Sequence, residues 1–268
     1  MARGKTSRRQ NGRIKLGMLI FDFDGVLIKS IDEVTLTVYN ATAGKLVTSL
    51  AALPKALVSL FQRNRFHVQP IGDAILLMNW CLKNYHSAAE KILTRQEFRT
   101  IISGAESGVP ERTQAIYTMR QRFIDKAPET WMALHQTYQP LWSELLRNQN
   151  RPFVILTNKD RDATLRLCRH FGLNIMQQDI YSGDHGLSKV ENMKQIQVRF
   201  RSDFYYFIDD SVKNLQELDA HLDTAARNLT LLFASWGYTG PEDPDIAQAA
   251  GYAVCKQADL ISLLVQDI

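Results

Sequence analysis

Acidic side chains follow two separate apolar runs of the sequence, at points where parallel strands would end. Asp22 comes directly after the run MLIF and Asp24 follows two positions later, while Asp209 and Asp210 come directly after FYYFI. Carboxylates brought together repel one another and take up protons unless a cation lies between them. Ligand sets made only of oxygen favour Mg²⁺, which keeps several waters and commonly binds a substrate phosphate. If the two runs are parallel strands of one sheet, this pattern indicates a Mg²⁺ site that handles phosphate.

Three further polar residues have comparable positions. Thr157 and Asn158 come directly after the apolar run FVIL, and we expect Lys189 in a loop before a helical pattern. An open α/β sheet binds its ligands at the carboxyl ends of its strands, so these groups are expected to face the carboxylates. Each motif alone also fits a turn, a helix N-cap or a surface lysine. Their joint occurrence, in an order that suits one sheet, favours a site.

The elements that must position these residues are short strands that alternate with helices. Continuous apolar runs, typical of parallel strands covered on both faces, predict strands at 18–21, 153–156, 204–208, 229–234 and 252–255. Helical spacing predicts helices at 160–171, 190–200 and 211–221. The predicted fold class is therefore α/β, with a Rossmann-like open parallel sheet and right-handed crossovers.

A long stretch of different character separates the first strand from the second. Helical spacing recurs there at 34–48, 55–63, 71–85, 95–103, 111–125 and 129–147, and no strand pattern is evident. Thr94 and Glu97 have the spacing of a capping box at a helix start. We predict a disordered basic arm at 1–15, an α/β core at 16–32 and 150–268, and an inserted all-helical cap domain at 33–149.

Composition sets broad limits on this interpretation. The 268 residues are 45% hydrophobic and 22% charged, and no apolar run approaches the 18 residues or so that a membrane span needs. The three cysteines have no CxxC spacing, which favours a reducing compartment over disulfides or a cysteine zinc site. The net charge of +4 comes from residues 1–15, which hold six Lys and Arg and no acid. That arm is expected to be solvated, with RNA, anionic lipid or a targeting receptor as alternatives.

The order of the motifs resembles that of the haloacid dehalogenase-like superfamily, and within it the phosphoglycolate phosphatases and their relatives. The matching motifs are FDFDGV at 21–26, LTN at 156–158, Lys189, and IDDS at 208–211. The resemblance covers roughly 16–30 and 150–260. No motif in the insert is matched, but its position after the first strand resembles the subgroup with a helical cap.

The resemblance implies a role for each residue. Asp22 would be the nucleophile that forms an aspartyl phosphate, and Asp24 the general acid and base. Thr157 and Asn158 would hold the transferring phosphoryl oxygens, and Lys189 would balance the charge of nucleophile and phosphate. The implied Mg²⁺ ligands are the side chains of Asp22 and Asp210 and the backbone carbonyl of Asp24. Asp209 would lie behind these ligands or bind the metal through a water molecule.

An acid at position 24 favours phosphate esters, because dehalogenases and phosphonatases of this family lack one there. The implied function is a Mg²⁺-dependent phosphatase that hydrolyses a small phosphomonoester, a phosphorylated metabolite, in the cytoplasm. Two alternatives stay open. One is a weakly active or non-catalytic phosphoryl-binding or regulatory protein of the same fold. The other is a phosphatase acting on a nucleic acid end with help from the basic arm, which the core disfavours because it lacks interleaved aromatic and basic residues.

Two positions depart from the family pattern. Asn214 stands where relatives commonly have Asp, and we expect it to weaken or reshape the outer shell of the metal. Lys29 stands where many relatives have Asp, and we expect it to be solvated rather than in contact with substrate.

Substrate choice is expected to come from the cap, where the sequence is less informative. The stretch QRNRFHVQPIGD either forms an ordinary polar turn or reaches the core and reads an anionic group through Arg63, Arg65, His67, Gln69 and Asp73. His185, close to Lys189 in the sequence, is a weaker candidate for substrate contact.

Overall fold

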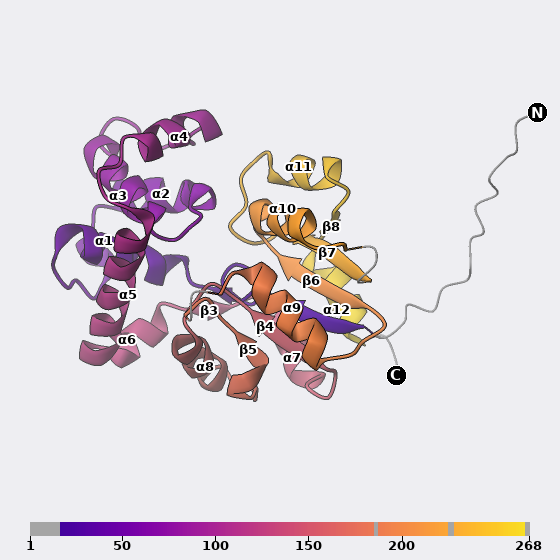
Figure 1. The fold of residues 1–268 in the computed structure, drawn as a ribbon. Helices are drawn as coiled ribbons and strands as arrows, with labels where there is room; N and C mark the ends of the chain where they lie inside the picture. Colours follow the sequence, from indigo (N-terminus) through magenta and orange to yellow (C-terminus); the bar gives the residue numbers. More distant parts are fainter. Residues whose placement is uncertain (1–16, 185–186, 225–227, 266–268) are drawn as a thin grey trace, which may run out of the picture.

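Six parallel strands form the central sheet of the computed structural model, which describes residues 17–184, 187–224 and 228–265 (Figure 1). Their order is β5-β4-β1-β6-β7-β8. The strands are β1 (Met18–Phe21), β4 (Phe153–Leu156), β5 (Ile180–Tyr181), β6 (Tyr205–Asp209), β7 (Leu229–Ala234) and β8 (Ala253–Cys255). Phe21 at the end of β1 is in register with Ile155 of β4 and Ile208 of β6. The carboxyl ends of these three strands are therefore nearly level, and the residues that follow them meet at one edge.

Both faces of the sheet are covered by helices, as the continuous apolar runs predict. Leu19 and Phe21 pack into one hydrophobic core, and Met18 and Ile20 pack into another. The first core includes residues of α7 (Leu141–Arg147), α8 (Arg161–His170) and α12 (Gln257–Val265). The second includes residues of α9 (Lys189–Arg199), α10 (Val212–His221) and α11 (Asp243–Ala249). The predicted α/β class with an open parallel sheet is confirmed.

Between β1 and β4 the chain leaves the sheet and forms a helical body beside it (Figure 1). Its helices are α1 (Ile31–Ala43), α2 (Lys55–Arg63), α3 (Asp73–Asn84), α4 (Arg95–Ser103), α5 (Val109–Lys126) and α6 (Pro128–Ala133). The capping box at the start of α4 is confirmed, because Thr94 and Glu97 each accept a hydrogen bond from the other's backbone N–H. Two short strands flank these helices in the sequence and form a separate small sheet at the base of the helical body. There β3 (Gln136–Thr137) pairs antiparallel with β2 (Ile28–Lys29).

The last helix predicted for the insert is not continuous, which bears on where the insert ends. The helix predicted at 129–147 is divided into α6 and α7 by β3 and by Pro140, which precedes α7. Helix α7 belongs with the sheet side of the molecule, because Trp142 Nε1 donates to Phe171 O at 3.1 Å and the helix packs against α12. We therefore propose residues 31–133 as the cap. The predicted arm at 1–15 lies outside the described residues.

Some elements are shorter or more numerous than the sequence pattern indicates. Strand β5 has only two residues, too few to produce a recognisable apolar run. Helices α11 and α12 follow the last two strands and were not predicted. In the described part of the chain, no helix combines the length and the apolar character needed to cross a membrane.

His135 is buried where the insert joins the sheet side. Its ring contacts Trp131 edge-on with 4.6 Å between the ring centroids, and its Nδ1 lies 3.0 Å from Trp131 O. Its Nε2 has no hydrogen-bond partner among the described residues. Burial is the main reason that the pKa of His135 falls from 6.5 to about 4.

This shift predicts a loss of stability in mild acid. Between pH 6.5 and 4 the unfolded chain binds a proton at His135 that the folded chain does not, so the free energy of unfolding falls as the pH falls. The loss approaches about 1.4 kcal/mol per pH unit. Urea unfolding at pH 7 and pH 5 should show a larger loss in the wild type than in His135→Asn, which keeps a donor near Nδ1. Equal losses in the two proteins would contradict the prediction.

Candidate active site

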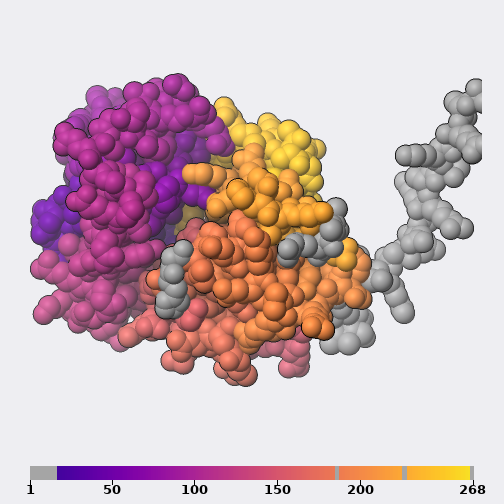
Figure 2. All heavy atoms as spheres, in the orientation of Figure 1, coloured from indigo at the N-terminus to yellow at the C-terminus, as the bar shows by residue number. Residues whose placement is uncertain are grey.

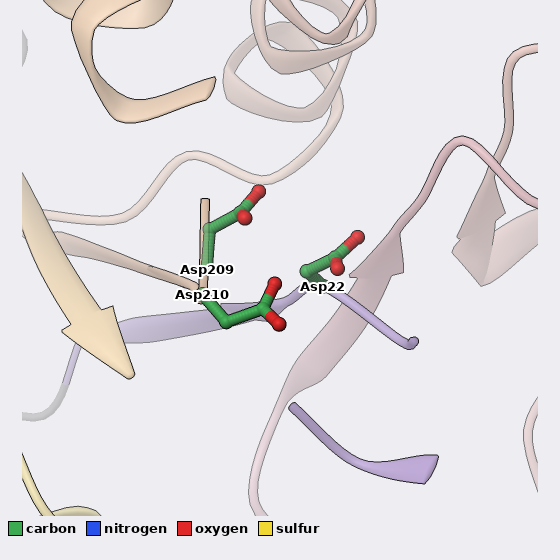
Figure 3. A group of neighbouring side chains, drawn as sticks. All are labelled: Asp22, Asp209 and Asp210. Atoms are coloured by element: carbon green, nitrogen blue, oxygen red, sulfur yellow. The ribbon is translucent and has the colours of Figure 1, made fainter. Parts of the chain in front are cut away.

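Three carboxylates meet at the carboxyl edge of the sheet, from the ends of β1 and β6 (Figure 3). One oxygen each from Asp22, Asp209 and Asp210 lies within 4.8 Å of the others, and all three residues are buried. Lys189 Nζ donates to Asp22 Oδ1 at 2.7 Å and to Asp209 Oδ2 at 2.6 Å. A single ammonium group therefore bridges two of the three carboxylates.

Lys189 is the first residue of α9, not a loop residue as predicted. A capping box fixes the start of this helix: Ser188 Oγ accepts from Glu191 N at 3.2 Å, and Glu191 Oε2 accepts from Ser188 N at 2.8 Å. The sequence SKVE carries this signal, since Ser and Glu three residues apart are typical of a helix start. The helix start holds the stem of Lys189 so that its ammonium group reaches the acids.

Burial and like charge oppose the ionisation of this cluster. Burial raises the pKa of Asp22 well above its ordinary value. Lys189 opposes this rise, whereas Asp209 and Asp210 add to it. Burial and then Asp209 raise the pKa of Asp210 to about 7. Burial alone would lower the pKa of Lys189, but Asp209 and Asp22 raise it above its ordinary value. Full ionisation of the cluster would thus place more negative charge here than one lysine can balance.

The surroundings of Asp210 keep its carboxylate at this edge. Tyr238 N donates to Asp210 Oδ2 at 2.5 Å. A Cβ atom on Gly25, whose φ is +93°, would lie 2.0 Å from Asp210 Oδ2, and one on Gly237 would lie 2.3 Å from Asp210 Cβ. Only glycine leaves room for the carboxylate at these positions. An oxygen-only set held this closely fits a small, hard divalent cation such as Mg²⁺.

Asp24 points to a different partner and does not join the carboxylate cluster of the described residues. Lys159 Nζ lies 3.2 Å from Asp24 Oδ1 and 3.7 Å from Glu33 Oε2. Glu33 is fully buried on α1, where Arg120 of α5 donates to it at 2.8 Å. Burial alone would raise the pKa of Asp24, but Lys159 and a hydrogen bond from Ser30 bring it below its ordinary value. Asp24 is therefore ionised in this arrangement.

Sequence reasoning missed Lys159, Glu33 and Arg120. Lys159 directly follows the Thr157-Asn158 pair, so its place near a strand end was a signal that could have found it. Glu33 and Arg120 lie inside helical patterns, where the sequence does not say which charged residue faces the site.

Thr157 and Asn158 follow β4 at the same edge. Thr157 is buried, its N–H donates to Tyr181 O at 2.9 Å, and its Oγ1 accepts from Lys159 N at 3.1 Å. The backbone oxygen of Asn158 accepts from Tyr117 Oη at 3.1 Å, which is a contact from α5 of the insert.

One cavity of about 110 Å³ collects most of the predicted site. Its lining includes Asp22, Asp24, Thr157, Asn158, Lys189 and Asp210 from the sheet side. Asp209 lies behind this wall, fully buried, and connects to it through Lys189. The insert contributes Arg65, Gln69 and Arg120 to the lining. In Figure 2 the indigo and magenta surface of the insert lies against the orange and yellow surface of the sheet side.

The polar stretch of the insert reaches the cavity through only two of its five candidates, Arg65 and Gln69. The other three have partners elsewhere: Arg63 pairs with Glu90, His67 Nε2 lies 2.7 Å from Leu93 O, and Asp73 pairs with Arg112 at 2.8 Å. Lys29 is exposed on β2 and does not line the cavity, in keeping with a solvated lysine. His185 lies outside the described residues.

Comparison with known proteins finds similarity to solved structures only. No protein-family model matches the chain, and no curated protein matches its sequence. A predicted phosphoglycolate phosphatase from Haemophilus somnus has a TM-score of 0.56 at 17% identity, covering 94% of this chain and 99% of its own. A haloacid dehalogenase-like family hydrolase from Streptococcus pneumoniae has a TM-score of 0.56 at 15% identity, covering 92% and 97%. A haloacid dehalogenase family hydrolase from Deinococcus radiodurans, solved with bound phosphate and sodium, has a TM-score of 0.51 at 14% identity, covering 93% and 95%. At these identities the likeness establishes the fold.

The geometry of the carboxylate cluster predicts that Mg²⁺ stabilises the folded protein. A cation among these oxygens offsets their repulsion. At a Mg²⁺ concentration one hundred times its Kd, the free energy of unfolding should rise by about 2.7 kcal/mol. Thermal unfolding with and without MgCl₂ measures this rise. It should disappear in Asp210→Asn and persist in Asp203→Asn, which changes an exposed acid away from the cavity. Equal rises in the wild type and Asp210→Asn would show that the ion binds elsewhere.

Proposed function

We propose that this protein, which has the fold of the haloacid dehalogenase-like phosphatases, is a Mg²⁺-dependent phosphatase that hydrolyses a small phosphomonoester through an aspartyl phosphate on Asp22. The observation that carries the proposal is the position of Asp22. It lies beside Lys189 and Asp210, in the same cavity as Asp24 and Thr157. A nucleophile, an acid and base, a hydroxyl donor and a cation site within one cavity are the groups that phosphoryl transfer to a carboxylate requires.

The charges around the cavity support the joint binding of a metal and a phosphate. Its wall and the layer behind it hold five carboxylates and four cationic groups. The carboxylates are Asp22, Asp24, Glu33, Asp209 and Asp210, and the cationic groups are Lys159, Lys189, Arg65 and Arg120. A divalent cation and a phosphate dianion together add no net charge to this set. The cation offsets the repulsion among the acids, whereas a phosphate dianion alone would add two negative charges to a buried site that already holds more carboxylates than cationic groups, which is costly.

Asp22, Asp210 and Asp209 are the side chains that would hold the metal, with the backbone carbonyl of Asp24 as the further ligand that the family resemblance implies, and a bound Mg²⁺ would draw charge from the phosphoryl oxygens. The remaining work belongs to side chains of the chain itself. Lys189 donates to Asp22, which favours its ionised form, and lines the cavity that would receive the phosphate. Thr157 Oγ1 and the Asn158 amide bind the transferring oxygens.

The reaction proceeds in two steps. In the first step the Asp22 carboxylate attacks phosphorus, the bond from phosphorus to the leaving oxygen breaks, and Asp24 gives that oxygen a proton. In the second step Asp24 takes a proton from water, which attacks the aspartyl phosphate and releases inorganic phosphate and free Asp22. Because Lys159 keeps Asp24 ionised before substrate binds, the first step requires that substrate binding weaken this ion pair and that Asp24 take up a proton from water beforehand.

The size and placement of the cavity favour a small phosphorylated metabolite as the substrate. The cavity of about 110 Å³ lies between the insert and the sheet edge, and the insert would limit the access of bulk water to the phosphoaspartate. The cytoplasm is the proposed compartment. The three cysteines are free and buried, which suits reducing conditions.

The nucleophile assignment predicts the behaviour of Asp22→Asn in a screen of small phosphomonoesters with Mg²⁺. The variant should lose turnover by at least about 1,000-fold, because an amide does not replace the attacking carboxylate. Its thermal unfolding midpoint should stay close to that of the wild type, since one of the repelling charges is removed. Asp203→Asn serves as the matched control and should retain wild-type turnover. Full turnover by Asp22→Asn would overturn the assignment, and a wild type that binds Mg²⁺ but cleaves no phosphomonoester would overturn the proposed function.

A further inference from the structure

Gln69 of the insert makes its polar contacts with a single turn of the sheet side. Its Oε1 accepts from Ser211 Oγ at 2.6 Å, and its backbone oxygen accepts from Lys213 Nζ at 2.8 Å. Its Nε2 donates to Asn214 Oδ1. All three partners lie at the start of α10, directly after the Asp209-Asp210 pair. One insert side chain is thus joined to the turn that carries the carboxylates.

Asn214 extends this contact into the catalytic cluster. Its Nδ2 donates to Asp209 Oδ2 at 2.8 Å, the same oxygen that accepts from Lys189 Nζ at 2.6 Å. Lys189 in turn donates to Asp22 Oδ1 at 2.7 Å. A continuous series of hydrogen bonds therefore runs from Gln69, through Asn214, Asp209 and Lys189, to Asp22.

The amide at position 214 is chemically necessary for this series. It accepts from Gln69 with its oxygen and donates to Asp209 with its nitrogen. An ionised aspartate, the residue expected there from the family pattern, only accepts hydrogen bonds. It would keep the contact with Gln69 but would face Asp209 with a second negative charge. Asn214 is buried in this position, which makes that repulsion costly.

We propose that Gln69 and Asn214 are a positioning pair that couples the placement of the insert over the cavity to the alignment of Asp209, Lys189 and Asp22. When the insert covers the cavity, Gln69 orients the Asn214 amide, and the amide holds Asp209 so that Lys189 is shared with the nucleophile. This role rests on the proposed phosphatase function. It also replaces the expectation that position 214 acts mainly on the metal.

Two substitutions break the series at different bonds. Asn214→Asp keeps an acceptor for Gln69 but removes the donor to Asp209. Gln69→Glu keeps the acceptor for Ser211 but removes the donor to Asn214. Gln121→Glu makes the same amide-to-acid change on an exposed insert residue whose side chain bonds to Asp125, so it serves as the matched control.

The experiment measures kcat and KM for the full chain with Mg²⁺ on the best phosphomonoester of the screen, with thermal unfolding to confirm that each variant is folded. Both single variants should lower kcat about 10-fold to 100-fold, the usual effect of removing a group that orients a site residue, with KM changed less than about 3-fold. The double variant should be no worse than the poorer single variant, because both changes break one series. The control should match the wild type.

The possible failures are distinguishable. If the wild type turns over substrate and both folded single variants keep wild-type kcat, the positioning role is wrong while the proposed function stands. The same holds if the variants lose thermal stability alone, or if the effects of the two substitutions multiply in the double variant. If the wild type cleaves no phosphomonoester, the proposed function fails and the positioning role fails with it.

Discussion

Three buried carboxylates lie together with one ammonium group, that of Lys189, which bonds to two of them, and most other features of the molecule follow from this imbalance of charge. The adjacency of β1 and β6 brings Asp22 and Asp209–Asp210 to one level of the sheet edge. Burial there raises the pKa of Asp22 and of Asp210, so the acids are poorly ionised without a further cation. Gly25 and Gly237 leave the space that Asp210 occupies, and the helix start at Ser188 places the lysine. These local features maintain an arrangement that the fold alone would not favour.

The insert is connected to both Asp22 and Asp24, in each case through a lysine. One series of contacts runs from Gln69 through Asn214, Asp209 and Lys189 to Asp22. The other runs from Arg120 through Glu33 and Lys159 to Asp24. In the proposed reaction the first series ends at the nucleophile and the second at the proton carrier. The position of the insert is thereby linked to the charge and orientation of both groups, in addition to the exclusion of water.

The parts of this site that sequence could predict are those set by strands. An apolar run followed by polar or acidic residues identifies a strand together with its carboxyl end. The sequence alone could therefore assign Asp22, Asp209, Asp210 and Thr157 to one edge of the sheet. Strand β5 is too short to produce a recognisable apolar run. Lys189 was predicted in a loop, because the capping box in the sequence SKVE, which starts α9, was not recognised. The insert residues were harder, since a helical pattern identifies a buried face but not the cavity beyond it. Only the packing of α1 and α5 shows that Glu33 and Arg120 face Lys159.

The central claim is that Asp22, Asp209 and Asp210 hold a divalent cation beside a phosphate, and it can be tested directly. Mn²⁺ in place of Mg²⁺ provides an anomalous signal, so crystals grown with MnCl₂ and inorganic phosphate would locate the ion without any assay of turnover. The account predicts one strong anomalous peak among the oxygens of these three carboxylates, with phosphate density bounded by Thr157, Asn158 and Lys189. A cluster that stays free of metal at saturating Mn²⁺, or a peak that lies only at other acidic residues, would contradict it.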